Sequence, residues 1–428
     1  MPMRYVDYVK LNYKPAKQDL ICEFYMEAGK GKSLKEAAGA VAAESSVGTW
    51  TAVTTAPAGI GKLAAKVFSI KGNYIKVAYP IELFELNNVP QIMSSIAGNI
   101  FGMKEVKNLK LLDVDFPDKL IKQFKGPLFG IKGVRKTFGI KKRPLLGTII
   151  KPKLGLDSAR HAKVAYEAWV GGCDIVKDDE NLSSQSFNNF KKRVKLSLKA
   201  RDKAEKETGS IKAYMPNITA ETREMLRRAK FVKKQGGKYA MVDIVSVGWS
   251  ALQTLREENE DLKLILHAHR AGYAAFSRNP KHGISMLVIA KLVRLIGVDQ
   301  LHIGTIVGKM DTPKKEVVAI DQEIEERIIK DKSLEKRHLL EENWLHIKPV
   351  FAVCSGGLNP LHVPYLMKVL GNNIIIQAGG GIHGHKLGTR AGSKAMLDVI
   401  EGVMEGKSLA EIASESRELA VAIKQWKK

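Results

Sequence analysis

The stretch Gly-Gly-Cys-Asp-Ile-Val-Lys-Asp-Asp-Glu, residues 171–180, contains a complete strand signal within ten residues. Two glycines end a preceding helical segment, an apolar run follows, and three acids stand directly behind Lys177. A short β-branched run entered from a glycine break is typical of parallel sheets in which helices and strands alternate. The stretch therefore predicts a buried strand with charged residues at its C-terminal end.

The same pattern recurs from about residue 143 onward. An apolar run, a polar or glycine-rich break and a helical segment follow one another eight times. Helical periodicity lies between the runs, for example in 158–170 and 221–235. Alternation of this kind over about 280 residues predicts a parallel (β/α)8 barrel, whose chemistry lies at the C-terminal strand ends. The predicted strands are 145–151, 173–177, 211–215, 240–247, 262–269, 300–306, 347–353 and 373–378.

A doubly wound open sheet is the alternative arrangement of alternating strands and helices. No glycine fingerprint follows the first run, which disfavours it. Residues 1–120 show a different pattern, which predicts a smaller, ferredoxin-like α+β domain, and residues 121–428 are then the barrel domain. In the smaller domain we expect strands at 6–13, 20–25, 67–70, 74–79 and 109–114, and helices at 33–44 and 89–100.

Composition narrows the class of protein. The chain has 428 residues, 45% of them apolar and 27% charged, which suits two domains with a sizeable core. Cys22, Cys173 and Cys354 are far apart and fit neither a disulfide framework nor a paired-cysteine zinc site, which favours the reducing cytoplasm. No apolar run reaches the roughly 18 residues of a membrane span, and the N-terminus lacks a signal-peptide pattern, so we expect no membrane partner.

The formal net charge of +24 raises the alternative of a nucleic-acid-binding protein. The basic residues are spread over amphipathic segments such as 190–206, are interleaved with acids, and lack the aromatic stacking positions of a single-strand binder. We therefore expect no specific nucleic-acid partner, and interpret the charge as a solvated basic surface that attracts anionic substrates.

Lys177 allows two interpretations. Side chains two residues apart on a strand share a face, so Lys177 and Asp179 lie together, while Asp178 points away and Glu180 can turn back toward Asp179. One interpretation is a salt bridge at a strand end. The other is a Mg2+ site, in which the two carboxylates are joined by a carbamate formed on the neutral amine of Lys177 with CO2. These residues alone leave both open.

Other predicted strands also end in polar groups, which a barrel would bring to one end. Glycine-rich loops after the seventh and eighth strands can expose backbone N–H groups to a phosphate, although plain tight turns are the alternative. With cationic groups across the barrel mouth, the sequence suggests a substrate with two anionic groups, a bisphosphate. The groups are Lys151 and Lys153, His267, His269 and Arg270, His302, Lys309 in a glycine-flanked loop, and the segments 354–358 and 377–382.

Taken together, these motifs resemble the large subunit of ribulose-1,5-bisphosphate carboxylase/oxygenase (RuBisCO), in particular its archaeal-type form III branch. The resemblance implies Mg2+-dependent carboxylation of ribulose-1,5-bisphosphate by CO2 through an enediolate, with competing oxygenation by O2. The products would be two molecules of 3-phosphoglycerate, in nucleotide (AMP) salvage. The motifs that carry the resemblance are 42–51, 98–102, 151–156, 171–181, 267–271, 304–309, 355–357 and 379–381.

The resemblance also implies roles for individual residues. The metal ligands would be Lys177, as a carbamate formed with activating CO2, Asp179 and Glu180. The catalytic residues would be Lys151, Lys153, Lys177, His269 and Lys309. The substrate-binding residues would be Glu44, Thr49, Trp50, Asn99, Lys153, Arg270, His302, Lys309, Ser355, Gly356, Gly357, Gln377, Gly379 and Gly380.

In the family, the residues that match Glu44, Thr49, Trp50 and Asn99 are donated by a neighbouring subunit. The resemblance therefore implies a homodimer, or a higher assembly of dimers with shared active sites, and no small subunit. One departure is Ile149, which stands where many members carry threonine, with Thr148 just before it. That change bears on activity level and gas selectivity, and it removes no metal ligand.

An alternative within the same resemblance is a RuBisCO-like protein that enolises or isomerises another sugar phosphate. Such relatives lose several residues of the catalytic set. Lys151, Lys177, His302, Lys309 and Ser355 are all present here, which favours the carboxylase.

Overall fold

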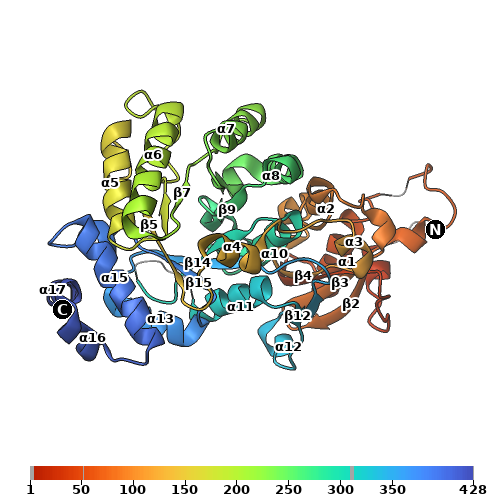
Figure 1. Cartoon of the computed structure of the whole chain (residues 1–428). Coiled ribbons are helices and arrows are strands. Elements are labelled where there is room, and N and C mark those ends of the chain that lie inside the picture. The colour runs from red at the N-terminus through yellow and green to blue at the C-terminus, as the bar shows by residue number, and fades with distance from the viewer. Residues whose placement is uncertain (1–3, 52, 309–312, 428) are drawn as a thin grey trace. The chain divides into compact units, whose positions relative to one another are not determined.

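The structure is a computed structural model that describes residues 4–51, 53–308 and 313–427 (Figure 1). It divides into two compact units. Unit 1 comprises Met1–Gly126, Gly272–Gly297 and Glu326–Ile347, and unit 2 comprises Pro127–Ala271, Val298–Glu325 and Lys348–Lys428. The domain boundary expected between residues 120 and 121 stays a prediction, because these units are defined by packing and unit 1 includes two later segments of the chain.

Unit 1 is built on an antiparallel sheet with the strand order β4-β1-β3-β2. One helix, α1, follows the first strand and another, α2, follows the third, so the elements run βαββαβ. This order and pairing make the ferredoxin-like fold expected from the sequence. A short later strand, β10 (Gly283–Ile284), pairs in parallel with β4 and extends the sheet. The elements are β1 (Leu20–Ala28), α1 (Leu34–Glu44), β2 (Lys66–Lys71), β3 (Tyr74–Tyr79), α2 (Val89–Ile96) and β4 (Val106–Asp115).

Local chemistry explains the start of α1 and its packing. Ser33 caps the helix, and the side chains of Ser33 and Glu36 exchange hydrogen bonds with each other's backbone N–H. A Cβ on Gly39 would lie 1.9 Å from the Tyr5 carbonyl oxygen, so glycine lets the backbone of the preceding turn approach the helix closely.

Two predictions for unit 1 need correction. The strand expected at 6–13 is the 3-10 helix η1 (Tyr5–Tyr8), in which the Asp7 side chain accepts from the Arg4 backbone N–H, and only Val9 forms an isolated bridge. The helix expected at 89–100 ends at Ile96. The remaining short elements are η2 (Ile60–Leu63), η3 (Ile81–Leu83), η4 (Asn99–Gly102), α3 (Asp118–Ile121), α9 (Tyr273–Ser277), α10 (Met286–Ile296), β12 (Ile328–Ile329), α12 (Leu334–Arg337) and β13 (Glu342–Asn343).

A buried ion cluster fastens the later segments of unit 1 to its sheet. The Nζ atom of Lys291, on α10, lies 3.0 Å from Asp113 Oδ1 on β4 and 3.2 Å from Glu342 Oε2 on β13. All three side chains are almost fully buried. Removing one member would leave the others buried without their charge partner, which is costly, so the cluster ties the three elements together.

Unit 2 is the expected (β/α)8 barrel. Its eight strands have the order β7-β6-β5-β15-β14-β11-β9-β8, and the neighbours are parallel. The ring closes where Ile218 N–H donates to the Met241 carbonyl at 2.9 Å and Met241 N–H donates to the Pro216 carbonyl at 2.9 Å. The strands are β5 (Leu145–Ile149), β6 (Ile175–Lys177), β7 (Ala213–Met215), β8 (Tyr239–Asp243), β9 (Ile265–His269), β11 (Gln300–Gly304), β14 (Phe351–Ser355) and β15 (Ile374–Gln377).

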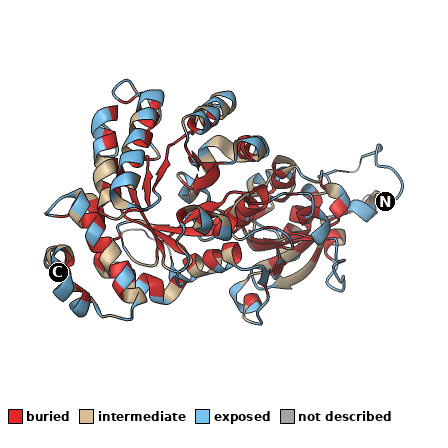
Figure 2. Cartoon of the chain, viewed as in Figure 1, coloured by how far each residue is buried: buried red, intermediate tan, exposed pale blue. Residues whose placement is uncertain are grey.

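Helices connect the barrel strands, and Figure 2 shows both buried and exposed residues along α5 and α6, as expected for amphipathic helices. Asp157 caps α5 by accepting from the backbone N–H groups of Ala159 and Arg160. The helices are α4 (Gly130–Phe138), α5 (Ser158–Val170), α6 (Phe190–Thr208), α7 (Thr222–Lys234), α8 (Ile244–Leu262), α11 (Lys314–Glu325), η5 (Pro360–His362), α13 (Val363–Leu370), α14 (Gly380–His383), α15 (Thr389–Met404), α16 (Leu409–Glu415) and α17 (Arg417–Trp426).

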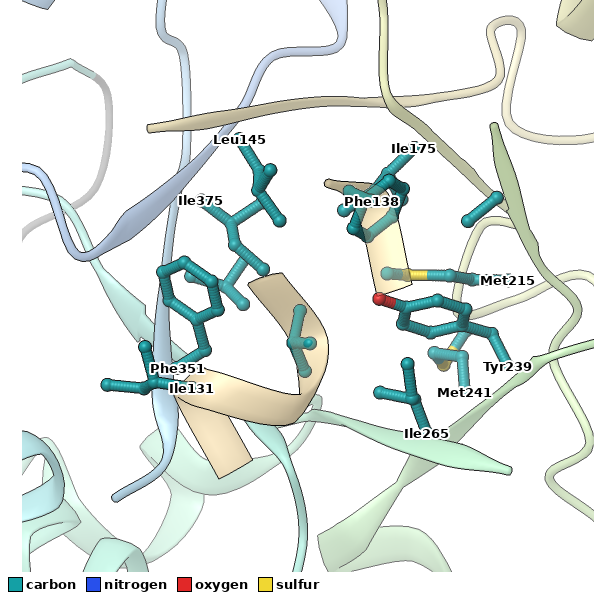
Figure 3. Close-up of a cluster of buried hydrophobic side chains, with 13 residues drawn as sticks. Ile131, Phe138, Leu145, Ile175, Met215, Tyr239, Met241, Ile265, Phe351 and Ile375 are labelled. Atoms are coloured by element: carbon teal, nitrogen blue, oxygen red, sulfur yellow. The ribbon is translucent and has the colours of Figure 1, made fainter. Parts of the chain in front are cut away.

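An apolar cluster fills the N-terminal end of the barrel (Figure 3). Ile131, Val134 and Phe138 of α4 pack there against residues at the beginnings of the strands, such as Leu145 and Ile265. Because this end is closed by apolar packing, polar chemistry in the barrel is confined to the C-terminal strand ends. The strand predicted at 240–247 is shorter in the structure, since β8 stops at Asp243 and α8 begins at Ile244.

Two further findings concern composition. Cys22, Cys173 and Cys354 are buried and unpaired with one another. Among the described helices, none combines the length and the apolar character that crossing a membrane would require.

Candidate active site

The end of β6 brings Lys177 together with the acids that follow it. Lys177 is fully buried, and its Nζ atom donates to the Asp178 carbonyl at 2.7 Å and lies 3.8 Å from Glu180 Oε2. Lys151, which follows β5, donates from Nζ to Asp179 Oδ2 at 2.9 Å. The predicted lysine and carboxylate cluster is therefore a compact group at the C-terminal end of the barrel.

Burial and charge set the ionisation of this group. Burial lowers the pKa of Lys177, and the nearby carboxylates of Glu180 and others only partly oppose this. Burial raises the pKa of Asp179, but the hydrogen bond and charge of Lys151 outweigh it and the pKa is lowered overall. Burial also raises the pKa of Glu180, but the charges of Lys177 and His269 and a backbone hydrogen bond together outweigh it, so the pKa is lowered overall. The acids are therefore carboxylates near neutral pH, while the amine loses its proton more readily than a surface lysine.

The donor chemistry fits Mg2+ only if Lys177 is modified. No three His, Cys, Asp or Glu side chains within the described part of the chain are grouped as metal ligands. Asp179 and Glu180 supply two carboxylates, and a carbamate on Lys177 would supply a third anionic oxygen donor. If Lys177 stays an ammonium group, its ion pair with Glu180 is weak, because the 3.8 Å between Lys177 Nζ and Glu180 Oε2 exceeds hydrogen-bond distance.

Asp178 points away from this group, as strand alternation predicts. Its Oδ1 accepts from the Tyr214 hydroxyl at 2.7 Å, and its Oδ2 accepts from Arg193 Nε and from the Asn217 backbone N–H, each at 3.0 Å. Asp178 and Arg193 are fully buried. Burial raises the pKa of Asp178, but the charge of Arg193 together with His161 and the hydrogen bond of Tyr214 holds that pKa far below its usual value. These bonds fix the backbone that carries Lys177 and Asp179.

His269, at the end of β9, faces the same group. Its Nδ1 lies 2.8 Å from Asp243 Oδ1, and its Nε2 lies 3.7 Å from Glu180 Oε2. Asp243 therefore orients the imidazole. The sequence did not single out Asp243, because the predicted strand continued to residue 247 and hid this strand end within it; the β8 boundary is the signal that finds it.

The ends of β11 and β14 bring His302 and Ser355 together. Ser355 Oγ lies 2.8 Å from His302 Nδ1, and His302 Nε2 lies 2.9 Å from His267 Nε2. Burial lowers the pKa of His302 well below its usual value, and the neighbouring His269 adds to the shift. His302 is thus a neutral hydrogen-bonding group, and Arg270, which is 5% exposed, supplies the permanent positive charge expected for a phosphate.

The glycine loops and their neighbours lie at the same barrel end. Gly356 and Gly357 have φ angles of 126° and 80°, a region in which glycine is preferred. A Cβ on Gly379 would lie 3.0 Å from Lys151 Cε, so a side chain there would crowd the lysine. Gly380 begins α14 and is exposed.

Gln377 and Lys153 complete the predicted set within unit 2. Gln377 is fully buried at the end of β15, and neither amide atom has a hydrogen-bond partner among the described residues. Gly147 leaves room for it, since a Cβ there would lie 3.2 Å from Gln377 Nε2. Lys153 is more exposed, with its Nζ 3.9 Å from Glu180 Oε1.

The predicted residues of unit 1 form a smaller group. Glu44 and Asn99 line one pocket of about 410 Å3, together with two serines that follow α1 and two serines of α2. Thr49 and Trp50 are exposed, and Trp50 is 85% exposed. Their donation to a neighbouring subunit's site stays a prediction. Lys309 lies outside the described residues.

Ile149 is the register partner of Lys177 on the adjacent strand, so the departure from the family pattern lies beside the central lysine. Thr148 does not replace the missing hydroxyl there. Its Oγ1 donates to the Ala378 carbonyl at 2.6 Å and lies 2.9 Å from His383 Nε2. An apolar side chain therefore stands next to Lys177 where the usual pattern has a hydroxyl.

The fold and this constellation define a (β/α)8-barrel enzyme whose acid–base groups and anion-binding loops share one barrel end. Residues 130–426 match the family model described as ribulose bisphosphate carboxylase large chain, catalytic domain. Residues 7–120 match the model for the N-terminal domain of the same chain. The chain belongs to the ribulose bisphosphate carboxylase large-chain family.

Relatives and solved structures support this membership over the full length. The ribulose bisphosphate carboxylase of Methanocaldococcus jannaschii is 53% identical over 99% of this chain and 100% of its own. A dimeric archaeal Rubisco from Hyperthermus butylicus has a TM-score of 0.94 at 47% identity, over 99% of each chain. The octameric Rubisco of Pyrococcus horikoshii, in a complex with sulfate ion, has a TM-score of 0.92 at 46% identity, over 99% of this chain and 97% of that one.

Proposed function

We propose that this enzyme carboxylates ribulose-1,5-bisphosphate, with Mg2+ and a carbamate on Lys177, and that oxygenation by O2 competes. The observation that carries the proposal is the fully buried Lys177, with its lowered pKa, beside the two ionised carboxylates of Asp179 and Glu180. The family membership supports the bisphosphate as substrate, and the family resemblance implies two molecules of 3-phosphoglycerate as products. The proposal extends to AMP salvage as the source of the bisphosphate and to a cytoplasmic location.

Carbamate formation follows from the state of Lys177. The lone pair of the neutral amine attacks the carbon of CO2, an N–C bond forms, one C=O electron pair moves to oxygen, and a proton leaves the nitrogen. Burial favours this step because it raises the neutral fraction of the amine. The carbamate, Asp179 and Glu180 would then hold Mg2+, which when bound supplies Lewis-acid stabilisation for the substrate oxygens.

The other residues have acid–base tasks in the proposal. The carbamate oxygen on Lys177 takes the proton from C3 of the bisphosphate. CO2 adds at C2, water adds at C3, and the C2–C3 bond breaks. Lys151 Nζ–H then gives a proton to the carbanion left at C2, with Lys153 beside it, and His269, oriented by Asp243, is the second acid–base residue. Lys309 is assigned to the new carboxylate by the family resemblance alone.

The two phosphates of the substrate would bind on opposite sides of this group. Arg270, His302 and Ser355 take one phosphate side, with Gly356, Gly357 and Gln377 lining the same region. Gly379 and Gly380 take the other. Glu44, Thr49, Trp50 and Asn99 of a neighbouring subunit would complete each site, so we propose a dimer as the smallest functional unit, without a small subunit. The dimeric and octameric Rubiscos among the solved relatives are consistent with assemblies of dimers.

The test is to incubate the purified chain with Mg2+, labelled bicarbonate and ribulose-1,5-bisphosphate without oxygen, and to measure acid-stable label in 3-phosphoglycerate. The proposal predicts label that depends on both Mg2+ and the bisphosphate. Absence of label from folded protein at several temperatures would contradict it. If the C3 hydrogen of the bisphosphate is nevertheless lost to water, the enzyme only enolises this substrate, which would favour the alternative of a RuBisCO-like enolase or isomerase of another sugar phosphate.

A further inference from the structure

A line of hydrogen bonds runs within the barrel from its apolar end to the candidate site. The Tyr239 hydroxyl lies 3.1 Å from Gln300 Nε2, and Gln300 Oε1 lies 2.8 Å from His267 Nδ1. The line continues from His267 Nε2 to His302 Nε2 at 2.9 Å, and from His302 Nδ1 to Ser355 Oγ at 2.8 Å. We call these five residues the relay. The first four are at most 2% exposed, and Ser355 is half-buried at the site.

Both histidines of the relay are neutral. Burial lowers the pKa of His267 to about 3, and burial also lowers the pKa of His302 well below its usual value. A neutral imidazole has one nitrogen that donates and one that accepts. The hydrogens must therefore all point one way along the relay, either toward Tyr239 or toward Ser355. The two directions contain the same number of hydrogens, so a change of direction takes up no proton.

Tyr239 decides between the directions. With Gln300 Nε2 donating to the Tyr239 oxygen, the phenolic hydrogen is left to point into the apolar cluster, where Figure 3 shows the ring near Met215 and Met241. A buried donor without an acceptor is costly. Turning the Gln300 carboxamide end for end keeps the same heavy-atom distances, because its two ends are nearly alike in shape. The phenol then donates to the amide oxygen, and the amide nitrogen donates to His267 Nδ1.

This direction has a consequence for Ser355. His267 donates from Nε2 to His302 Nε2, so His302 donates from Nδ1 to Ser355 Oγ, and the serine hydrogen is free to face the barrel mouth. We propose that Tyr239, Gln300 and His267 are positioning residues that hold His302 as its Nδ1–H tautomer, so that Ser355 aims its hydroxyl hydrogen at an anionic group of the substrate. The inference rests on the proposed function in one respect, that a phosphate of the substrate binds beside Ser355.

The first test reads the tautomers directly. Long-range 1H–15N NMR spectra of the chain labelled with 15N-histidine report which ring nitrogen carries the hydrogen, and the spectra of His267→Phe and His302→Gln assign the two rings. The inference predicts the hydrogen on Nδ1 of His302 and on Nε2 of His267. Finding it on Nε2 of His302 would overturn the inference. If these residues only stabilised the fold, neither tautomer of His302 would be required.

The second test changes the far end of the relay. Tyr239→Phe removes the phenolic hydrogen that favours relay hydrogens pointing toward Ser355. The change is made at the apolar end of the barrel, away from the candidate site. We expect the Nε2–H form of His302 to appear, and the Kd for inorganic sulfate, used as the anion probe, to rise about three- to tenfold, as expected for one hydrogen bond. Met241→Leu is the matched control, because it changes the apolar packing beside the Tyr239 ring and removes no hydrogen-bonding group of the relay.

The outcomes separate the inference from the proposed function. If Tyr239→Phe leaves the His302 tautomer and the sulfate Kd unchanged, or if Met241→Leu changes them equally, the relay does not act as described. Neither measurement requires turnover. A chain that shows the expected tautomers and sulfate response but forms no labelled 3-phosphoglycerate would contradict the proposed function and leave the relay standing.

Discussion

Lys177 and Lys212 are both buried lysines of the barrel unit, and burial lowers the pKa of each. They differ in place, because Lys177 ends β6 while Lys212 precedes β7, at the apolar end of the barrel. Lys212 Nζ donates to the Cys173 carbonyl at 3.0 Å and has a structural role. Comparing the two lysines therefore separates the effect of burial from the effect of a position at the C-terminal end of a barrel strand.

We expect Lys177→Ala to abolish carboxylation, because it removes the proposed carbamate and with it one of the three proposed metal donors. Incorporation of labelled CO2 under saturating substrate measures this. Lys212→Met is the matched control, and it should retain most of its turnover while losing some thermal stability. Carboxylation that survives in Lys177→Ala would show that the carbamate assignment is wrong.

Asp243 is the second residue with a specific expectation. Its carboxylate holds His269 Nδ1 at 2.8 Å, which fixes the ring orientation and favours hydrogen on that nitrogen. We expect Asp243→Asn to lower kcat about tenfold or more with little change in KM, as for loss of an oriented acid–base group. Steady-state kinetics measure this. Thr219→Val serves as the control, because it removes a hydroxyl that accepts from the Asp243 backbone N–H at 2.9 Å and donates to Asp243 Oδ2 at 3.4 Å but leaves the carboxylate beside His269. An equal loss there would mean that the placement of Asp243, and not its bond to His269, matters.

At the scale of elements, strand β1 in the sheet of unit 1 carries a buried glutamate, Glu23, whose pKa is raised. Glu23 on β1 is 2% exposed, its register partner on β3 is Lys76, and His338 Nδ1 lies 3.2 Å from its Oε1. Burial raises the pKa of Glu23 to about 7, although Lys76 opposes the shift. The pKa of Glu342 on β13 is also raised to about 7 by burial, against the opposing charge of Lys291.

The pH dependence of stability follows from these shifts. Between the unfolded pKa near 4.5 and the folded pKa near 7, folded Glu23 keeps its proton and the unfolded chain loses it. The free energy of unfolding therefore falls as pH rises through this window and levels off above it. Glu23→Gln should remove part of this fall and stabilise the chain at pH 8 by up to about 3 kcal/mol.

Denaturant unfolding at pH 5 and pH 8 measures that effect. Part of the slope should remain in Glu23→Gln, because Glu342 contributes with the same sign. The matched control is Glu27→Gln on the same strand, where Lys281 lowers the pKa of the carboxyl to about 2, so the change should not flatten the slope between pH 5 and pH 8. An unchanged slope in Glu23→Gln would contradict the raised pKa.

The sequence was most informative where the hydrophobic periodicity and the glycine breaks indicate the same elements. All eight barrel strands and the helix at 158–170 were predictable, because apolar runs alternate with amphipathic segments. The run at 240–247 misled, since its β-branched residues continue into α8 and no glycine or proline marks the change at Asp243. The strand expected at 6–13 failed for a local reason, a hydrogen bond from the Arg4 backbone N–H to the Asp7 side chain that closes a turn.

The residues of the candidate site also fall into those that the sequence predicts and those that it does not. Lys177, Asp179 and Glu180 were predictable from strand parity and from the family motifs. The partners Asp243 and Gln300 were not, because a hydrogen bond between neighbouring strands depends on barrel register, which the linear sequence does not display. The pocket that joins Glu44 to Asn99 was visible only through the family resemblance.

At the scale of the whole molecule, the proposed sharing of active sites between subunits makes a quantitative prediction. Glu44→Gln and Lys177→Ala should each inactivate both sites of a dimer. In a mixed dimer, one site combines the intact barrel of one chain with the intact Glu44 of the other. Random co-assembly should therefore restore about a quarter of wild-type activity, since half the dimers are mixed and each has one complete site.

Activity assay of the unfractionated co-expressed mixture measures this restoration. Two-step purification on different affinity tags then isolates the mixed dimers, which should have about half of the wild-type activity because one of their two sites is complete. The separately purified variants, assayed at the same total concentration, are the control. No activity in verified mixed dimers would place Glu44 and Lys177 in the same chain's site, or would show that Glu44 is dispensable to it.

The apolar floor formed by α4 has a consequence for how the enzyme can be improved. Because apolar packing closes one end of the barrel, substrates and products reach the candidate site from the C-terminal end. The apolar cluster at the other end lies outside that route. Thermal stability can therefore be raised there by repacking Ile131, Val134 and other aliphatic side chains of the cluster, without changing a residue of the candidate site at the opposite end.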